Sequence, residues 1–363
     1  MMMEKKKKQQ KLAAFVFWLL RNANSNTFIS PTNPLRHVVL KIFWLVYQPI
    51  CMDFTKQHLQ KHHTKTVFSV AFHPRLPLFA TGSGDKSTIL YDISTSPPTV
   101  KFNLKHHTNY VMSVAFHPSL PLLATGSGDK STIIYDISTS PPTVKFNLKH
   151  HTYRVWFVAF HQTLPILATG SYDNSTIIYD ISTSPPTIKY NLKHHTNTVF
   201  SVAFHLSLPL LATGSDDKST ILYDISTSPP TVKHKLKHHT GWVYSVAFHP
   251  SLPLLITGSE DKSTIIYDIS NISTSSPTVK YHLKHHTSAV WSVAFHPSLP
   301  LFATGSWDKS TIIYDISISP PTVKHHLKHH TDTIFSVAFH PSLPLLATGS
   351  YDNSTILYNL DKM

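Results

Sequence analysis

The sequence predicts an all-β protein in which seven similar units, each an antiparallel sheet of four strands, form a closed ring. Three observations lead to this prediction. The chain of 363 residues contains seven in-phase copies of one segment. Each copy holds four short runs with strand character, and loops that contain proline separate these runs. Units of four strands that recur about every 40–45 residues are typical of β-propeller blades, so we expect a seven-bladed β-propeller.

The tripeptide His-His-Thr marks the period of the repeat. It begins at residues 62, 106, 150, 194, 238, 285 and 329, so the spacing is 44 residues except for one step of 47. The longer step includes the insertion Asn271-Ile272-Ser273, in a loop rich in Ser, Thr and Pro. Because a loop takes up extra residues at little cost in free energy, the period continues beyond the insertion.

The fifth copy illustrates the four predicted strands. Residues 242–248 alternate in character, and residues 254–259 form a second run that ends in a Glu-Asp-Lys turn. Residues 263–269 are rich in β-branched and aromatic side chains, and residues 278–284 alternate polar with apolar side chains. None of these runs has the spacing of a helix. The sequence therefore predicts four strands in every copy, here named a to d in chain order.

The two ends of the repeat region complement each other. The last copy ends with strand c near residue 360, and no strand d follows it. Residues 53–60 precede the first His-His-Thr at the position of a strand d. We therefore expect this N-terminal strand to complete the seventh blade, which closes the ring and removes an exposed sheet edge.

The repeated residues resemble those of the WD-repeat β-propeller family. Units of that family begin with Gly-His, carry an Asp in the turn between strands b and c, and end strand c with Trp-Asp. Here His-His replaces Gly-His and Tyr-Asp replaces Trp-Asp, with Tyr358-Asn359 in the last copy. The resemblance covers residues 53–363. The turn aspartates are Asp85, Asp129, Asp173, Asp217, Asp261, Asp308 and Asp352.

The resemblance implies a hydrogen-bonded tetrad in each blade, formed by a His, an Asp, a Ser or Thr and the Trp. In the sixth copy these positions hold His286, Asp308, Thr304 and Tyr314. Tyr is smaller than Trp but still offers an O–H donor, so we expect a weaker or rearranged tetrad. A His, an Asp and a hydroxyl also form the triad of hydrolases. Because the set recurs in every copy, whereas an active site is usually single, we interpret it as structural and predict no catalytic residue and no enzyme.

Histidine is frequent, with 27 in the chain. The first histidines of the His-His pairs would form a ring, which leaves adventitious metal binding as an alternative. A metal site needs three or four ligands within about 2–2.3 Å of the ion, and we expect histidines on separate blades to lie too far apart for that. We therefore predict no functional metal site and no cofactor.

The copies differ mainly at four slots. Slots 1, 2 and 3 are residues 65, 66 and 68 in the first copy, just after His-His-Thr, and slot 4 is residue 84, just before the turn Asp. Because strands alternate in direction, the connection from strand d to strand a and the turn from b to c lie at the same end of a blade. All four slots should therefore lie on one face of the ring. In the family that the chain resembles, this is the top face, where partners commonly dock.

The residue types in these slots favour protein contacts. All four tryptophans of the repeat region occupy them, and Trp, Tyr and Arg are frequent in interface hot spots. The alternative is that side chains in slot 3 pack at the mouth of the central channel. The residues predicted to bind a partner are Tyr110, Arg154, Trp156, Tyr172, Asp216, Trp242, Tyr244, Glu260, Trp291, Trp307, Phe335 and Tyr351.

The formal net charge of +13 is unevenly distributed. Residues 1–51 hold eight Lys and Arg against one acid, and residues 52–363 hold 24 against 18. Lysines such as Lys101 and Lys105 lie near the two ends of a strand d, so we expect a basic outer rim. An alternative function is therefore the binding of RNA or anionic lipid headgroups by this rim. The other interpretation is a charged edge that discourages strand pairing.

The sequence divides into an N-terminal extension, residues 1–51, and a propeller, residues 52–363. The extension is basic, and its apolar runs are too short or too interrupted to span a membrane. Met52 is a candidate for the true start, because a strand begins at the next residue, while a secretory signal within residues 1–25 is the alternative. The single cysteine, Cys51, forms no internal disulfide, which fits a reducing compartment. We expect a cytoplasmic or nuclear protein.

These observations predict a non-catalytic scaffold for protein–protein interactions. Its partners would bind on the top face through the variable aromatic and charged loop positions. The propeller would act as a monomer within a larger complex and would have no integral membrane span. Binding of nucleic acid or anionic lipid stays open as the alternative.

Overall fold

The structure, a computed structural model, describes residues 58–362 of the chain. These residues form 28 strands in seven four-stranded sheets, followed by one short 3-10 helix, η1 (Leu360–Lys362). The prediction of an all-β, seven-bladed propeller is confirmed. The predicted extension, residues 1–51, and residues 53–57 of the predicted first strand lie outside the described residues.

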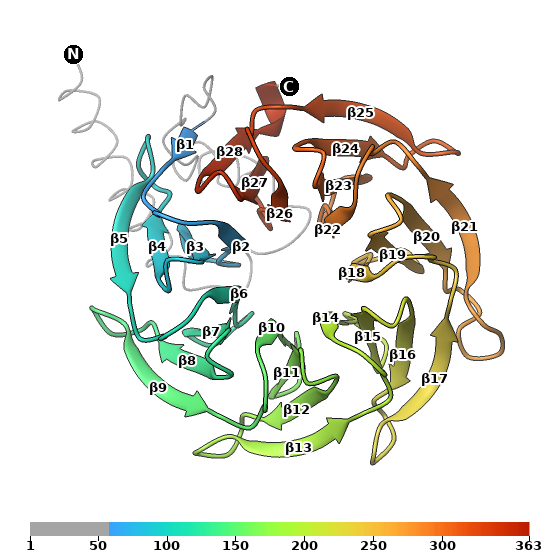
Figure 1. Cartoon of the computed structure of the whole chain (residues 1–363), viewed down its shortest axis with the longest axis horizontal. Helices are drawn as coiled ribbons and strands as arrows, with labels where there is room; N and C mark the ends of the chain where they lie inside the picture. The colour runs from blue at the N-terminus through green and yellow to red at the C-terminus, as the bar shows by residue number, and fades with distance from the viewer. Residues whose placement is uncertain (1–57, 363) are drawn as a thin grey trace, which may run out of the picture. The chain divides into compact units, whose positions relative to one another are not determined.

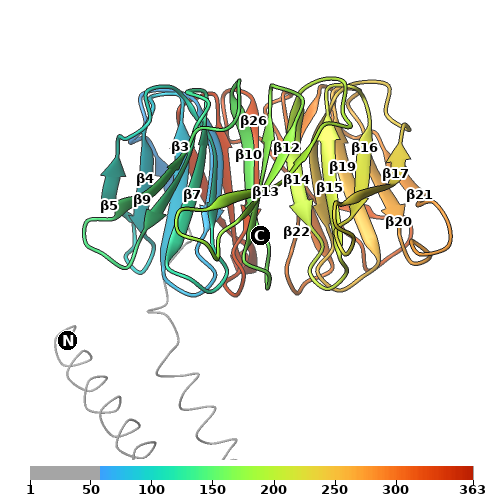
Figure 2. The same cartoon turned by 90° about the horizontal axis from the view of Figure 1, so that it is seen from below.

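The seven sheets stand around a central axis as the blades of the propeller (Figure 1). In each blade strand a lines the centre and strand d forms the outer rim, with strands b and c between them (Figure 1). Seen on its edge, the ring is a disc with loops on both faces (Figure 2). The strands of the fifth blade begin and end within one residue of the predicted bounds.

Chain order assigns the strands to the seven blades. Strands a are β2 (Val67–Phe72), β6 (Val111–Phe116), β10 (Val155–Phe160), β14 (Val199–Phe204), β18 (Val243–Phe248), β22 (Val290–Phe295) and β26 (Ile334–Phe339). Strands b are β3 (Leu78–Ser83), β7 (Leu122–Ser127), β11 (Ile166–Ser171), β15 (Leu210–Ser215), β19 (Leu254–Ser259), β23 (Leu301–Ser306) and β27 (Leu345–Ser350). Strands c are β4 (Thr88–Asp92), β8 (Thr132–Asp136), β12 (Thr176–Asp180), β16 (Thr220–Asp224), β20 (Thr264–Asp268), β24 (Thr311–Asp315) and β28 (Thr355–Asn359). Strands d are β5 (Thr99–Leu104), β9 (Thr143–Leu148), β13 (Thr187–Leu192), β17 (Thr231–Leu236), β21 (Thr278–Leu283), β25 (Thr322–Leu327) and β1 (His58–Gln60).

The seventh blade combines the two ends of the described chain. β1 pairs antiparallel with β28, so that His58 lies opposite Leu357 and Gln60 lies opposite Thr355. The strand order of this sheet is β1-β28-β27-β26. β1 therefore occupies the outer position that strand d holds in the other six blades.

Each strand a contains a β-bulge that the sequence pattern does not reveal. In β18 the pairing with β19 steps from Val243 to Ser245, so Tyr244 is the extra residue. The same step occurs at slot 3 of all seven blades. A bulge redirects the side chain of its extra residue. Here it turns slot 3 towards the mouth of the central channel.

The core lies between neighbouring blades. Leu104 of the first blade packs with Val111, Leu123 and Tyr135 of the second, and all four side chains are buried. Similar clusters follow between later pairs of blades. A Cβ atom added to Gly82 would lie 2.9 Å from Cγ1 of Val111 in the next blade. The glycine of the repeated Thr-Gly-Ser therefore permits the close approach of the blades.

A buried histidine follows each strand a. Nδ1 of His73 accepts hydrogen bonds from the backbone N–H groups of Arg75 and Leu76 at 3.0 and 2.9 Å. Its ring meets the ring of Phe116 in the next blade edge to face, with centroids 5.0 Å apart. This arrangement orders the loop between strands a and b and ties it to the next blade, a role that sequence reasoning did not assign. The equivalents are His117, His161, His205, His249, His296 and His340.

The three-residue insertion lies in the loop between β20 and β21. Ile272 is buried and joins the apolar cluster that contains Ile269. In the same loop, Oγ of Ser276 hydrogen-bonds to Nδ1 of His234 in the preceding blade at 3.0 Å. The blade absorbs the insertion without a change in its four strands.

Candidate functional site: the top face

Slots 2 and 4 contact each other in every blade. The N–H of Trp307 donates a hydrogen bond to the carbonyl of Ala289 at 2.9 Å, and the N–H of Glu260 donates to the carbonyl of Trp242 at 2.9 Å. The equivalent bond is present in all seven blades at 2.8–3.0 Å. The variable loops therefore lie together at one end of each blade, and we call the face that they form the top face.

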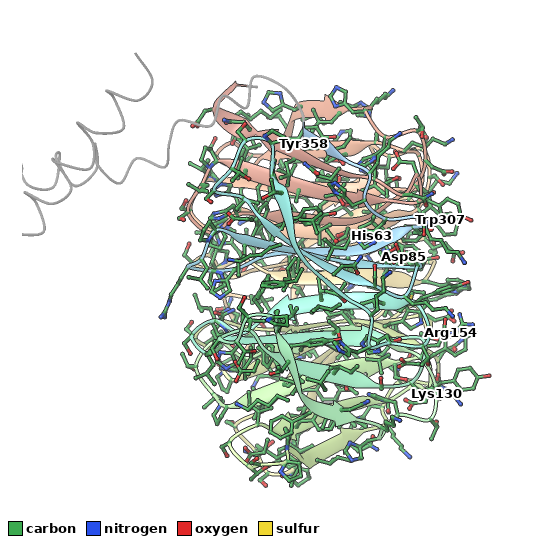
Figure 3. All side chains as sticks on the ribbon, turned by 90° about the vertical axis from the view of Figure 1, so that its left-hand side faces the viewer. His63, Asp85, Lys130, Arg154, Trp307 and Tyr358 are labelled. Carbon is green, nitrogen blue, oxygen red and sulfur yellow. The ribbon has the colours of Figure 1, made fainter. Side chains whose placement is uncertain are left out.

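The turn before strand c explains why slot 4 accepts any side chain. The N–H of Asp308 donates to Oγ of Ser306 at 3.0 Å, and the N–H of Lys309 donates to the carbonyl of Ser306 at 3.2 Å. None of these bonds uses the side chain of Trp307, which is 40% exposed. Figure 3 shows Trp307, Arg154 and Lys130 at the same face of the disc. Variation in slot 4 therefore changes the surface while the turn remains the same.

Six aromatic side chains are exposed on the top face. Their exposed fractions range from 36% for Trp242 to 56% for Tyr351. Within residues 58–362, every exposed Tyr and Trp occupies slot 1, 2 or 4. Five of these six are among the predicted contact residues, and Tyr153 is the sixth. The set is Tyr110, Tyr153, Tyr172, Trp242, Trp307 and Tyr351.

The side chains of slot 3 fill the mouth of the channel instead. Tyr244 stacks on Trp291 with ring centroids 3.9 Å apart, and Trp291 meets Phe335 edge to face at 4.9 Å. The ring centroid of Trp156, in the third blade, lies 6.2 Å from that of Trp291, in the sixth. These rings therefore meet across the channel. They leave a cavity of about 50 Å³, lined by these rings and by serines such as Ser245.

Burial distinguishes the aromatic side chains of slot 3 from those of the other three variable slots. Tyr244 is only 4% exposed, so its ring lies within the aromatic cluster and not on the open surface of the top face. The bulge directs its ring into the channel, where it packs against Trp291. Trp156, Trp291 and Phe335 are half-buried in the same cluster. Packing at the channel mouth, the alternative that the sequence left open for slot 3, describes these side chains better.

The top face differs in charge from one side to the other. On blades 2 and 3, Nζ of Lys130 lies 5.4 Å from the ring centroid of Tyr153, and Tyr153 stacks on Tyr172 at 5.3 Å. Arg154 is exposed beside them. On blades 4 and 5, the half-buried side chains of slot 4 are carboxylates. The face thus joins a basic aromatic region to an acidic aromatic one.

Asp216 and Glu260 form the acidic region. Burial raises the pKa of Asp216, and the charges of Glu260 and Asp217 raise it further, although Lys218 lowers it. Oε2 of Glu260 accepts a hydrogen bond from the N–H of Trp242 at 3.3 Å. The two carboxylates, on neighbouring blades, therefore lie close enough to repel each other.

Beneath the variable loops, a hydrogen-bonded network holds each blade. In blade 6, Nδ1–H of His286 donates to Oδ2 of Asp308 at 2.8 Å, and Nε2 lies 2.7 Å from the hydroxyl of Thr304. Asp308 also accepts bonds from the N–H of Thr287 at 2.9 Å and from the N–H and hydroxyl of Ser310. Burial by itself raises the pKa of the Asp308 carboxyl, but the hydrogen bonds from His286 and Ser310, the charge of His286 and the N–H of Thr287 together hold that pKa well below its usual range. The network therefore fixes an ionised carboxylate that ties strands a, b and c together.

Tyr314 borders this network. Its hydroxyl hydrogen-bonds to Nδ1 of His285 at 3.3 Å. Burial raises the pKa of Tyr314, the hydrogen bond with Thr304 lowers it, and the charge of Asp308 raises it. The group closest to the carboxylate of Asp308 is the hydroxyl of Ser310, a residue that the sequence analysis did not identify. Its signal was present in the sequence, because the serine after the turn lysine or asparagine is the same in all seven copies.

The first histidines of the His-His pairs pack within their own blades. The ring of His62 lies 5.6 Å from that of Tyr91, and the equivalent distances in the other blades are 5.5–5.7 Å. The part of the chain from 58 to 362 contains no group of three or more His, Cys, Asp or Glu residues that could hold a metal ion. In the same part, no helix is long and apolar enough to cross a membrane.

The outer rim is less basic than its lysines suggest. Nζ of Lys233 lies 3.1 Å from Oδ2 of Asp224, and Nζ of Lys280 lies 3.8 Å from Oδ2 of Asp268. In both blades, the aspartate that ends strand c faces a lysine of strand d. Part of the positive charge predicted for the rim is therefore compensated locally.

The fold and the site define a class of protein, namely a seven-bladed propeller with one internal network per blade and a variable top face. The model of the WD40 family, described as WD domain, G-beta repeat, matches residues 54–92, 98–136, 142–180, 186–224, 230–268, 277–315 and 321–359. The chain belongs to this family. Its propellers are generally non-catalytic and typically act as protein-interaction scaffolds. None of the curated proteins compared with the chain matches it.

Proposed function

We propose that the chain is a non-catalytic scaffold for protein–protein interactions and that partners bind on its top face. One observation carries this proposal. Within residues 58–362, every exposed Tyr and Trp lies in a variable slot of that face. Exposed aromatic clusters are typical of contact sites, and Trp and Tyr contribute strongly to interface energy. The scaffold below them is the same in every blade, so the slots alone distinguish one region of the face from another.

The exposed and the half-buried aromatics have different parts in this proposal. Trp242, Trp307 and Tyr351 act as anchors that enter the partner. Trp291 supports Trp307 from the channel side, since the two rings stack with centroids 5.7 Å apart and planes 16° apart. Anchors held in one orientation lose little conformational entropy on binding.

Affinity purification with the full chain tests the proposal. The variant Trp242→Ala/Trp307→Ala/Tyr351→Ala should lose the proteins that the native chain retains, while thermal unfolding shows that it is still folded at the temperature of the assay. The matched control replaces three exposed apolar residues of the outer rim, Val100, Val144 and Ile188, by Ala. Retention of the same proteins by the top-face variant would refute the proposal.

The alternative function, binding of RNA or anionic lipid by the rim, has less support because aspartates face some of the rim lysines. Electrostatic binding of a polyanion weakens steeply with salt. Retention on heparin that survives the three top-face substitutions and falls with salt would favour the rim. Elution of the chain at low salt would leave the protein scaffold as the better proposal.

A further inference from the structure

We propose that the top face over blades 4 to 6 binds the cationic side chain of a basic residue, lysine or arginine, of the protein partner. This inference rests on the proposed function and specifies what the partner presents. The groups that would form the site are the carboxylates of Asp216 and Glu260, the hydroxyl of Tyr244 and the rings of Trp242 and Trp307. We call this set the cation site.

Aromatic rings surround the cation site. The ring centroid of Tyr244 lies 6.0 Å from the ring centroid of Trp242 and 6.2 Å from that of Trp307. Both indoles are more than a third exposed, at 36% and 40%, so their surfaces are open to a ligand. A cation within about 6 Å of an indole face is attracted by the negative face of the ring. The two tryptophans therefore offer a cation apolar contact and electrostatic attraction together.

The two carboxylates give the site a negative charge. In the described part of the chain, the variable slots hold three acids, Asp216, Glu260 and Asp332, and the first two lie on neighbouring blades. Their mutual repulsion contributes to the raised pKa of Asp216. A cation between them would relieve that repulsion. Because the chain as a whole carries a formal charge of +13, this acidic pair is a local exception that a basic partner group would find attractive.

Tyr244 contributes a polar group that the described residues leave without a partner. Its side chain is 4% exposed, yet its hydroxyl has no hydrogen-bond partner among the described residues. Burial raises its pKa, and the charges of Glu260 and Asp216 raise it further, so the hydroxyl lies within the field of both carboxylates. A buried hydroxyl without a partner is costly. Its oxygen could accept a hydrogen bond from an ammonium or guanidinium group held by the two acids.

Gly241 allows this arrangement. A Cβ atom at position 241 would lie 2.9 Å from Cβ of Glu260 and 2.8 Å from the backbone nitrogen of Asp261. Any other residue in slot 1 would therefore require a shift of this loop or of Glu260. The fifth copy is the one copy that has Gly in slot 1, and it is also the one with Glu in slot 4. The pairing of these two residues indicates that the position of the carboxylate is built into the loop.

The donor set favours an organic cation over a metal ion. Two carboxylates and a phenol form the polar part, and residues 58–362 bring no third His, Cys, Asp or Glu into a group that could hold a metal. The remaining wall is aromatic. A weakly hydrated alkyl cation profits from such a wall, whereas a divalent ion prefers six or more oxygen ligands, about 2.0–2.6 Å away.

The test is a titration of the full chain with three blocked amino acids: Nα-acetyl-lysine methylamide, the arginine analogue and the uncharged norleucine analogue. The readouts are tryptophan fluorescence and the indole N–H signals of Trp242 and Trp307. We expect one of the two cationic probes to bind at least about tenfold more tightly than norleucine, and their comparison shows whether ammonium or guanidinium fits better. Equal binding of norleucine would overturn the proposal, and so would a response to calcium ions that neither cationic probe produces.

Variants locate the site. Asp216→Asn/Glu260→Gln should remove the preference for the cationic probe, and Tyr244→Phe should weaken its binding about threefold or more without a change in tryptophan packing. Asp332→Asn, which removes the third slot acid on blade 7, is the matched control and should leave binding unchanged.

Undiminished binding of the cationic probes by the double variant refutes the cation site. Suppose that neither cationic probe binds, while the capture of partner proteins still depends on Trp242 and Trp307. The cation site is then wrong, and the proposed function stands. Selective binding of a cationic probe, with capture independent of all top-face variants, would refute the proposed function instead.

Discussion

Oγ of Ser113 in blade 2 accepts a hydrogen bond from the backbone N–H of Val158 in blade 3 at 3.2 Å. Equivalent bonds of 3.0–3.2 Å join six of the seven pairs of neighbouring blades in the described chain. Between blades 3 and 4, Phe157 occupies the serine position and has no oxygen to accept a bond from the N–H of Val202. This junction therefore lacks a link that the others have.

The amide of Val202 should exchange its hydrogen about fivefold faster than the amides of Val158 and Val246, because one lost hydrogen bond contributes about 1 kcal/mol. Ser113→Ala should bring the exchange rate of Val158 to that of Val202 and lower the free energy of unfolding by about 1 kcal/mol. Ser119→Ala, in an exposed loop, is the control. Hydrogen exchange followed by NMR measures all of these rates, and equal protection of the three amides would contradict the role given to Ser113.

Asp308→Ala should lower the free energy of unfolding by about 3 kcal/mol, because it leaves Nδ1–H of His286 and the N–H of Ser310 without their acceptor in a mostly buried site. Asp315→Ala removes a carboxylate that accepts a bond from the exposed Ser317, and it should cost about 1 kcal/mol or less. Unfolding in urea gives both values. Similar values for the two variants would show that the network does not hold the blade.

Tyr244→Ala and Trp242→Ala should separate packing from contact. Tyr244 is buried in the aromatic cluster, so its removal should cost about 3 kcal/mol of stability. Trp242 is 36% exposed, so its removal should cost about 1 kcal/mol or less and act mainly on partner binding. Thermal unfolding of the two variants provides the comparison. A larger loss for Trp242 than for Tyr244 would reverse the roles assigned to slots 2 and 3.

The stability of the propeller should decrease in mild acid. Burial lowers the pKa of His340 to about 4, and burial lowers the pKa of its six equivalents in the other blades, assisted at His73 by the charge of Arg75. In the unfolded chain the pKa of histidine is about 6.5, so below that pH the unfolded chain binds more protons than the folded one. This contribution to stability is therefore complete above about pH 6.5 and is lost as the pH falls towards 4.

Thermal unfolding followed by circular dichroism should show a Tm that falls between about pH 7 and pH 5. His340→Asn keeps an acceptor for the N–H groups of Ser342 and Leu343 and should make the decrease shallower. The same substitution at the exposed His62 should leave the slope unchanged. A Tm that stays constant over this range would exclude the buried histidines as its cause.

Much of the top face could be predicted from the sequence, because comparison of the copies separates framework positions from variable ones. Trp307 and Tyr351 could be placed on an exposed turn from the alternation of strand direction alone. The role of Ser310 could not be separated from the rest of the constant phrase, since a constant residue has many possible reasons to be constant. The direction of Tyr244 could be given only as one of two alternatives, because a bulge is a property of the pairing between two strands and not of one strand.

The sequence by itself determined the number of blades, the bounds of the strands and the division between framework and variable slots. These properties depend on local, periodic sequence patterns, and each of the seven nearly identical copies shows the same pattern. Only the tertiary structure decided which variable residues lie near one another. Asp216 and Glu260 are 44 residues apart, and Trp156 and Trp291 come from the third and sixth blades. The two indole rings meet across the channel because the blades close into a ring, whereas Asp216 and Glu260 lie on two blades that pack side by side. Both relationships depend on packing between residues that are far apart in the chain.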